Sequence, residues 1–178
     1  MYVPASFAES DPQVIADFIS AHPLGILVSQ GDGDLIVTPV PFQFTGTTLV
    51  THVSRANHHW QALQTSSTCT VVFQGADAYV TPGWYATKQE TGMVVPTWNY
   101  EIVQLSGRAT IHDDPQWILD QVSNITNHME QPRDNSWAVT DAPDEFVAKQ
   151  LRAIVGIEIQ ITETVGKWKM SQNRNAAD

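Results

Sequence analysis

The spacing of hydrophobic and polar residues along the chain predicts short strands interrupted by helices. Between Ile154 and Thr164, isoleucines at every second position alternate with polar side chains, which is the pattern of a half-buried strand. Further strands are predicted over residues 24–30, 35–44, 48–53, 69–74, 78–81 and 94–111, the last being one long strand or two strands bent at Gly107. Pro39 and Pro41 cannot donate ladder hydrogen bonds, so their strand is expected to be interrupted or to lie at a sheet edge.

Turn and capping residues mark the ends of several elements. Gly31-Asp32-Gly33-Asp34 predicts a hairpin turn, because Asp-Gly tolerates the positive φ values of a tight turn. Asp11-Pro12 and Asp114-Pro115 are typical helix starts, and helical spacing of apolar residues continues to Ala21 and Met129 respectively. Shorter helices are expected over residues 56–64 and 142–150. These elements predict one mainly β domain with flanking helices, in which a closed barrel would remove the exposed strand edges.

Composition narrows the classes of function. The chain of 178 residues has a formal net charge of -10 and only nine Lys plus Arg, which argues against a broad nucleic-acid surface, and no helix-turn-helix is evident. The single cysteine, Cys69, lies in a β-branched segment and is expected to be a buried packing thiol. No apolar run is long enough to span a membrane, and residues 1–4 do not resemble a secretory signal, so a cytoplasmic location is expected.

The last thirteen residues concentrate positive charge and hydrogen-bonding side chains. Three of the nine cations, Lys167, Lys169 and Arg174, lie here beside Ser171 and Gln172. Cations next to hydroxyl and amide groups suit a phosphate and a heterocycle that carries several acceptors. The alternative is a frayed, solvated C-terminus.

Two other segments are candidates for ligand binding. At residues 52–57 a strand ends and a helix begins, so Ser54 and Arg55 could hold an anion, although Ser54 or Asn57 could equally be a helix cap and Arg55 a surface charge. At residues 94–100, alternation places Trp98 and Tyr100 on one strand face and Thr97 and Asn99 on the other. This segment is either an aromatic wall for a flat ligand or a core aromatic pair, and Lys88 lies on a loop nearby that is long enough to swing over a site.

Metal and catalytic signatures are weak. The spacing of His52, His58 and His59 does not match a structural metal site, but a single axial haem ligand among them stays open. The chain contains no GxGxxG or Walker loop, and no convincing nucleophile, general acid or general base. No catalytic or metal-binding residue is therefore predicted.

Several segments together resemble one family, the PaiB-like proteins, which are called FMN-binding negative transcriptional regulators. The segments that carry the resemblance are residues 1–4 with Phe7, 52–57 with Trp60, 73–75, 78–79, Pro82 with 84–85, 95–100, 151–158, 166–169 and 171–174. They span the chain from end to end. Met170 departs from the family, which usually has a smaller or branched aliphatic residue there.

The resemblance implies a split β-barrel of the flavin-reductase-like or pyridoxamine-phosphate-oxidase-like kind, forming a homodimer with FMN at the interface. Residues 1–178 would be one domain, with a helical insertion at about 114–150 and a ligand-binding tail at 166–178. By the resemblance, the phosphate would meet Ser54, Arg55 and Lys88 or Lys169, and the isoalloxazine would lie near residues 28–29. The full set of expected FMN contacts is Ser29, Thr38, Ser54, Arg55, Asn57, Lys88, Trp98, Asn99, Lys169, Ser171 and Gln172.

Three functions follow as hypotheses. The first is a cytoplasmic, PaiB-like FMN-binding regulator that acts without direct DNA contact. The second is an oxidoreductase that uses bound FMN with a second substrate such as a nicotinamide. The third is a haem-binding split barrel with His52, His58 or His59 as the axial ligand.

Overall fold

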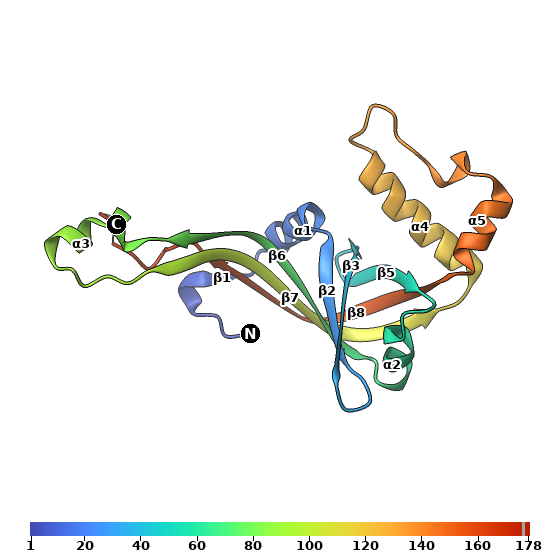
Figure 1. Ribbon diagram of the computed structural model, residues 1–178, viewed down its shortest axis with the longest axis horizontal. Helices are drawn as coiled ribbons and strands as arrows, with labels where there is room; N and C mark the ends of the chain where they lie inside the picture. The colour runs from blue at the N-terminus through green and yellow to red at the C-terminus, as the bar shows by residue number, and fades with distance from the viewer. Residues whose placement is uncertain (176) are drawn as a thin grey trace.

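The fold is an antiparallel sheet that wraps into a barrel, with a long ribbon projecting from one side and a helical unit from another (Figure 1). It was obtained as a computed structural model, which describes residues 1–175 and 177–178. The strands are β1 (Ala8–Glu9), β2 (Leu24–Gln30), β3 (Leu35–Pro41), β4 (Gln43–Phe44), β5 (Thr48–Ser54), β6 (Thr68–Val80), β7 (Thr97–His112) and β8 (Ile154–Lys169). The helices are η1 (Ala5–Phe7), α1 (Pro12–Ala21), α2 (His59–Thr65), η2 (Pro82–Trp84), α3 (Ala86–Glu90), α4 (Pro115–Glu130), η3 (Val139–Asp141) and α5 (Asp144–Leu151).

The barrel closes where the chain passes from β3, at one edge of the sheet, to β4, at the other edge. The strands run in the order β3-β2-β6-β7-β8-β5-β4, with β1 beside β8. At one end β3 pairs with β2, and at the other β4 pairs with β5, yet only Phe42 separates β3 from β4. Thr51 Oγ1 on β5 donates a hydrogen bond to the Pro41 carbonyl at 2.7 Å, which holds the two ends together. The expected interruption of this proline-containing strand is therefore confirmed, and the break lies at Phe42.

Alternating apolar side chains from the central strands fill the barrel. Leu27, Val71, Phe73, Val103 and Ile157 are each completely buried. Helices α1 and α2 cover the barrel with their apolar faces, as their spacing predicts. Cys69 is buried in this core, and burial raises the pKa of its thiol to about 11, so the residue is the inert packing thiol that its segment predicts.

Strands β6, β7 and β8 continue past the barrel and form the projecting ribbon. Two sequence expectations were wrong here. Residues 69–74 and 78–81 are parts of one strand, because the ladder passes Gly75 through a bulge between Gln74 and Asp77 instead of breaking. The last strand extends to Lys169, because residues 166–169 pair with β7 despite their polarity. We call residues 75–101 together with 166–175 the arm.

Helices α4 and α5 form a unit inserted between β7 and β8. Asp114 caps α4 by accepting hydrogen bonds from the backbone N–H groups of Gln116 and Trp117, as its Asp-Pro signal predicts. The Trp117 ring stacks on His112 with centroids 4.0 Å apart and lies against Gly156 of β8, which fixes the unit to the barrel. None of the helices in the described part of the chain has both the length and the apolar character needed to cross a membrane.

Candidate functional site

Four polar residues, from β2, β3, the first residue of α2 and the turn before it, form one connected group of hydrogen bonds. His59 Nε2 lies 2.9 Å from Ser29 Oγ of β2, and His59 Nδ1 lies 2.8 Å from Thr38 Oγ1 of β3. Asn57 Nδ2 donates to Thr38 Oγ1 at 3.4 Å, and Asn57 Oδ1 accepts from the His59 backbone N–H at 3.0 Å. We call Ser29, Thr38, Asn57 and His59 the barrel cluster. Three of its members were expected from the sequence to contact FMN.

His59 holds the barrel cluster together, although it was not among the expected FMN contacts. Its side chain is completely buried, and burial lowers its pKa because the charged form loses hydration. A neutral ring donates from one nitrogen and accepts at the other, which matches two hydroxyl partners. Both ring nitrogens are therefore occupied, which leaves neither free as an axial haem ligand in this arrangement. Helix α2 begins at His59 and not at residue 56, because residues 54–57 form a turn closed by Asn57 N–H and the Ser54 carbonyl.

The free energy of unfolding should depend on pH through His59. The unfolded chain binds a proton near the ordinary histidine pKa of about 6.5, whereas folded His59 binds it only at lower pH. Stability should therefore fall as pH drops below about 6.5, by at most about 1.4 kcal/mol per pH unit. Urea unfolding between pH 5 and 8 measures this slope, which should be shallower in His59→Gln than in wild type. His58→Gln, at the exposed neighbouring position, is the control and should keep the wild-type slope.

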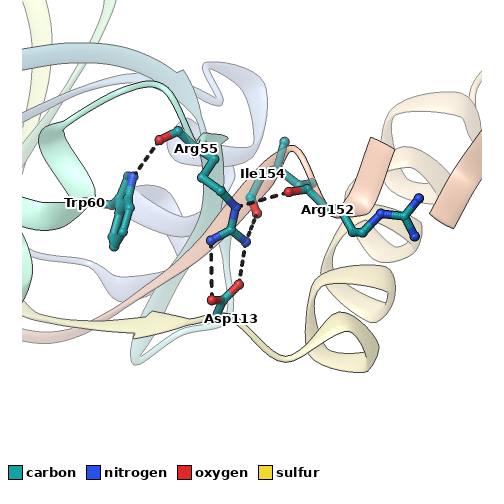
Figure 2. A network of polar contacts seen from close by, with 5 residues as sticks. All are labelled: Arg55, Trp60, Asp113, Arg152 and Ile154. Atoms are coloured by element: carbon teal, nitrogen blue, oxygen red, sulfur yellow. Dashed lines mark hydrogen bonds and ion pairs between the residues drawn. The ribbon is translucent and has the colours of Figure 1, made fainter. Parts of the chain in front are cut away.

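Arg55 lies close to the barrel cluster in sequence but is engaged elsewhere (Figure 2). Its guanidinium forms a two-pronged ion pair with Asp113, with Nη2–Oδ1 at 2.5 Å and Nη1–Oδ2 at 3.3 Å. It also donates to the carbonyls of Arg152 at 3.1 Å and Ile154 at 3.2 Å. The hydrogen bond between the two side chains raises the pKa of Arg55 and lowers that of Asp113. Arg55 thus joins the two ends of the helical insertion, and we call these contacts the Arg55 clasp.

Ser54, beside Arg55, makes a local contact. Its Oγ accepts a hydrogen bond from the Ala56 backbone N–H at 3.3 Å. This contact stabilises the turn that leads into α2 but is not a helix cap, because the N-cap of α2 is His58 and no side chain caps the helix. Ser54 and Arg55 therefore have structural contacts of their own, and neither belongs to the group of residues around His59.

A second group of expected residues lies on the arm. Lys169 Nζ donates to the hydroxyl of Thr97 and to the carbonyl of Trp98, while Ser171 Oγ donates to Asn99 Oδ1 at 2.9 Å. Gln172 closes a turn by accepting from the Met170 N–H at 2.7 Å and donating to the Trp168 carbonyl at 2.6 Å. We call Thr97, Trp98, Asn99, Lys169, Ser171 and Gln172 the arm cluster.

The C-terminal tail is built into the arm. Ser171 has a φ of 64°, an uncommon conformation for a residue other than glycine, and such outliers concentrate at functional sites. The Arg174 guanidinium lies 4.6 Å from the centre of the Tyr85 ring, and the Asn175 side chain donates to Thr87 Oγ1 at 3.2 Å. Lys88 belongs to α3, at the outer end of the arm, so the expectation that it lies on a loop was wrong (Figure 1).

The barrel cluster and the arm cluster are far apart within one chain. Strand β6 runs past both, because Cys69 pairs with Ser29 and Tyr79 pairs with Trp98. Ten residues of strand correspond to about 30 Å. Figure 1 likewise places α3 and the C-terminus at one extremity of the molecule and α2 beyond its centre. One small ligand cannot touch both clusters of the same chain.

Metal ligands do not gather in either cluster. Among residues 1–175 and 177–178, no group of three or more His, Cys, Asp or Glu side chains could hold a metal ion. The chemistry available is that of hydroxyl, amide, ammonium and aromatic groups, which suits an organic ligand with a flat ring.

This architecture defines a class of fold, the split β-barrel, and sequence comparison gives the family. Residues 1–163 match the family described as "Putative FMN-binding domain", and the chain belongs to this family. "Protease synthase and sporulation protein PAI 2" of Bacillus subtilis is 27% identical over 182 residues, covering 100% of this chain and 85% of that protein. The PaiB-like resemblance of the sequence is therefore confirmed.

Solved structures agree on the fold. The conserved hypothetical protein Rv2991 of Mycobacterium tuberculosis superposes with a TM-score of 0.71 at 14% identity, covering 100% of this chain and 96% of that one. The flavocytochrome Anf3 of Azotobacter vinelandii gives a TM-score of 0.68 at 20% identity, covering 93% of this chain and 70% of that one. These likenesses confirm the expected split β-barrel.

Proposed function

We propose that the protein is a homodimer in which the arm of each copy closes the barrel cluster of the other, with FMN between them. The observation that carries this proposal is the separation of the two clusters within one chain. The arm also exposes large apolar side chains that one copy leaves uncovered, namely Tyr79, Trp84, Met93, Val95 and Trp98. Large apolar side chains exposed together on one projecting element are typical of a contact surface, and two of them, Tyr79 and Trp98, pack edge to face.

The residues of the two clusters fit FMN by their chemistry. Trp98 offers an exposed ring for contact with the isoalloxazine, and Asn99 lies next to it on the same strand. The hydroxyl and amide groups of the barrel cluster, with Ser171 and Gln172 of the arm, would meet the polar edge of the ring. Bound FMN supplies hydride and single-electron chemistry, which requires no acid or base from the protein. The chain's own part is to orient the ring and to exclude water from it.

We infer a regulatory role that operates through the state of the flavin and without direct DNA contact. The family relationship supports regulation, and the net charge of -10 opposes approach to nucleic acid. The single buried cysteine suits a reducing cytoplasm. Oxidoreductase activity with a nicotinamide donor is the alternative, and bleaching of bound flavin by NADPH would favour it.

Titration of the purified protein with FMN tests the proposal. Light scattering should give twice the chain mass of 19.7 kDa, and absorbance should report about one flavin bound per chain. Dilution that dissociates the dimer should release the flavin in parallel, because each site needs two copies. A monomer that retains FMN at full affinity, or a Soret band in place of flavin bands, would contradict the proposal.

A further inference from the structure

The helical unit inserted between β7 and β8 contains a hollow of its own. Helix α4, the η3 turn and helix α5 surround a cavity of about 410 Å³, a size typical of sites for small organic molecules. Figure 1 shows these three elements beside the barrel and away from the arm. We call this hollow the insertion cavity. None of its lining residues belongs to the barrel cluster or the arm cluster, so a ligand here would be distinct from the flavin.

Helix α5 leaves its apolar face partly uncovered on the side of the insertion cavity. Val147, Ala148 and Leu151 recur at helical spacing, and all three line the cavity. Helices α1, α2 and α4 each have buried side chains, whereas none of residues 144–151, all of which the structure describes, is buried. A helix of this length depends on packing for its stability. An apolar group in the cavity would supply contacts that α5 lacks.

The facing side of the insertion cavity is also largely apolar. Leu119 of α4 and Val139 of η3 line it, and Val139 is itself buried. Ser123 and Thr140 add two hydroxyl groups to the lining, each able to donate or accept a hydrogen bond. Such walls suit a compact hydrocarbon group with few hydrogen-bonding positions.

Two exposed carboxylates give the insertion cavity its charge. Asp120 follows Leu119 on α4, Asp144 lies in the first turn of α5, and both line the cavity. The described residues that line it include no Lys, Arg or His, and no cation of the described chain lies within 4.0 Å of either carboxylate. The Asp120 carboxylate accepts a hydrogen bond from Gln116 Nε2 at 2.8 Å, which leaves its charge uncompensated. A cavity lined by charges of one sign concentrates ions of the other, so this one favours a cation.

We propose that the insertion cavity binds a small organic amine, with its hydrocarbon part against α5 and its ammonium group at Asp120 and Asp144. Charge complementarity selects this occupant, because an ammonium carries three N–H donors and can serve both carboxylates. A neutral ligand of the same shape gains only the apolar contacts, and an anionic one is repelled. The inference goes beyond the proposed function and does not depend on it.

Three ligands that share a phenyl ring and differ in charge test the inference. At neutral pH 2-phenylethylamine is a cation, 2-phenylethanol is uncharged and phenylacetate is an anion. Ligand-observed NMR titration of the full chain at low salt should show the amine binding about tenfold more tightly than the alcohol, the combined value of two exposed ion pairs. Phenylacetate should bind more weakly than the alcohol. High salt should reduce the preference for the amine, because exposed charges are screened.

Variants of the lining residues separate the charge from the apolar contacts. Asp120→Asn and Asp144→Asn should each lower the preference for the amine about threefold and leave the affinity for the alcohol unchanged. Glu145→Gln is the matched control, because it removes a charge from the same first turn of α5 but does not line the cavity, and it should keep the preference. Ala148→Arg, at an exposed lining position, should block both ligands.

Methyl NMR spectra locate the bound amine. The methyl resonances of Leu119, Val147 and Leu151 should shift as 2-phenylethylamine is added, while those of Leu27, buried in the barrel, should not. Equal affinity for the amine and the alcohol, no binding of the amine, or shifts confined to the barrel would overturn the inference. Shifts at the cavity on raising the protein concentration alone would assign it to a second copy of the chain and would also overturn it. Flavin absorbance reports on the proposed function separately, so the two can fail independently.

Discussion

Two variants that each abolish flavin binding should restore it when their chains are mixed. Thr38→Arg places a bulky cation in the barrel cluster, and Asn99→Arg does the same in the arm cluster. Each variant alone should lose FMN affinity by at least about a hundredfold, because every site in its homodimer contains the intruding side chain. In a mixed dimer, one site combines both substitutions and the other combines none. The second site is intact.

The measurement is flavin bound per chain after the two variants are unfolded together and refolded at equal concentrations. Random pairing makes half of the dimers mixed, so roughly one quarter of all sites should bind FMN with wild-type affinity. Each variant refolded alone is the control and should bind none. If mixed dimers form, as tagged chains would report, and no binding returns, then each site is built by a single chain and the exchange of arms is wrong.

Gly156→Ala should give the largest loss of stability among single substitutions at the junction of barrel and insertion. A β-carbon at Gly156 would lie 2.1 Å from Cζ3 of Trp117, far inside van der Waals contact. The indole cannot withdraw easily, because it stacks on His112, and His112 in turn contacts Glu158 at 2.8 Å. We expect the free energy of unfolding to fall by about 3 kcal/mol, near the upper end for overpacking.

Urea unfolding followed by tryptophan fluorescence measures this effect. Gly83→Ala is the matched control, because a β-carbon there would have only an ordinary contact of 3.4 Å with the Thr81 side chain. Adding Trp117→Phe to Gly156→Ala should recover part of the lost stability by making room for the methyl group. An unchanged stability in Gly156→Ala would mean that the insertion is not fixed to the barrel through this contact.

The features that the sequence predicts well are those encoded by neighbouring residues. Asp11-Pro12 and Asp114-Pro115 carry their own capping group and first-turn proline, so both helices start where they are expected to. The strand 24–30 is bounded by Pro23 and the Gly31-Asp32 turn, and it has the predicted limits. Alternation at residues 154–164 predicts the strand correctly because one face is buried.

The features that the sequence does not reveal depend on residues far apart in the chain. Gly75 predicts the end of a strand when only its neighbours are considered. In the structure, pairing with β7 continues on both sides of a bulge at this position. From its sequence context Arg55 is a candidate to bind an anion, but its guanidinium is already paired with Asp113, which lies 58 residues later in the chain. The partners of His59 are likewise 21 and 30 residues away, so no local pattern marks it as the centre of the barrel cluster.

The Arg55 clasp has a consequence for how this fold can vary. Because Asp113 and Arg152 both contact Arg55, the chain leaves the barrel and returns to it at nearly the same point. The segment between them contains helices only, and it contributes no strand to the barrel. Insertions of different length or sequence could therefore replace the segment between Asp113 and Arg152 without a change in the barrel strands. Such an exchange would leave the strands of the barrel and the barrel cluster in place.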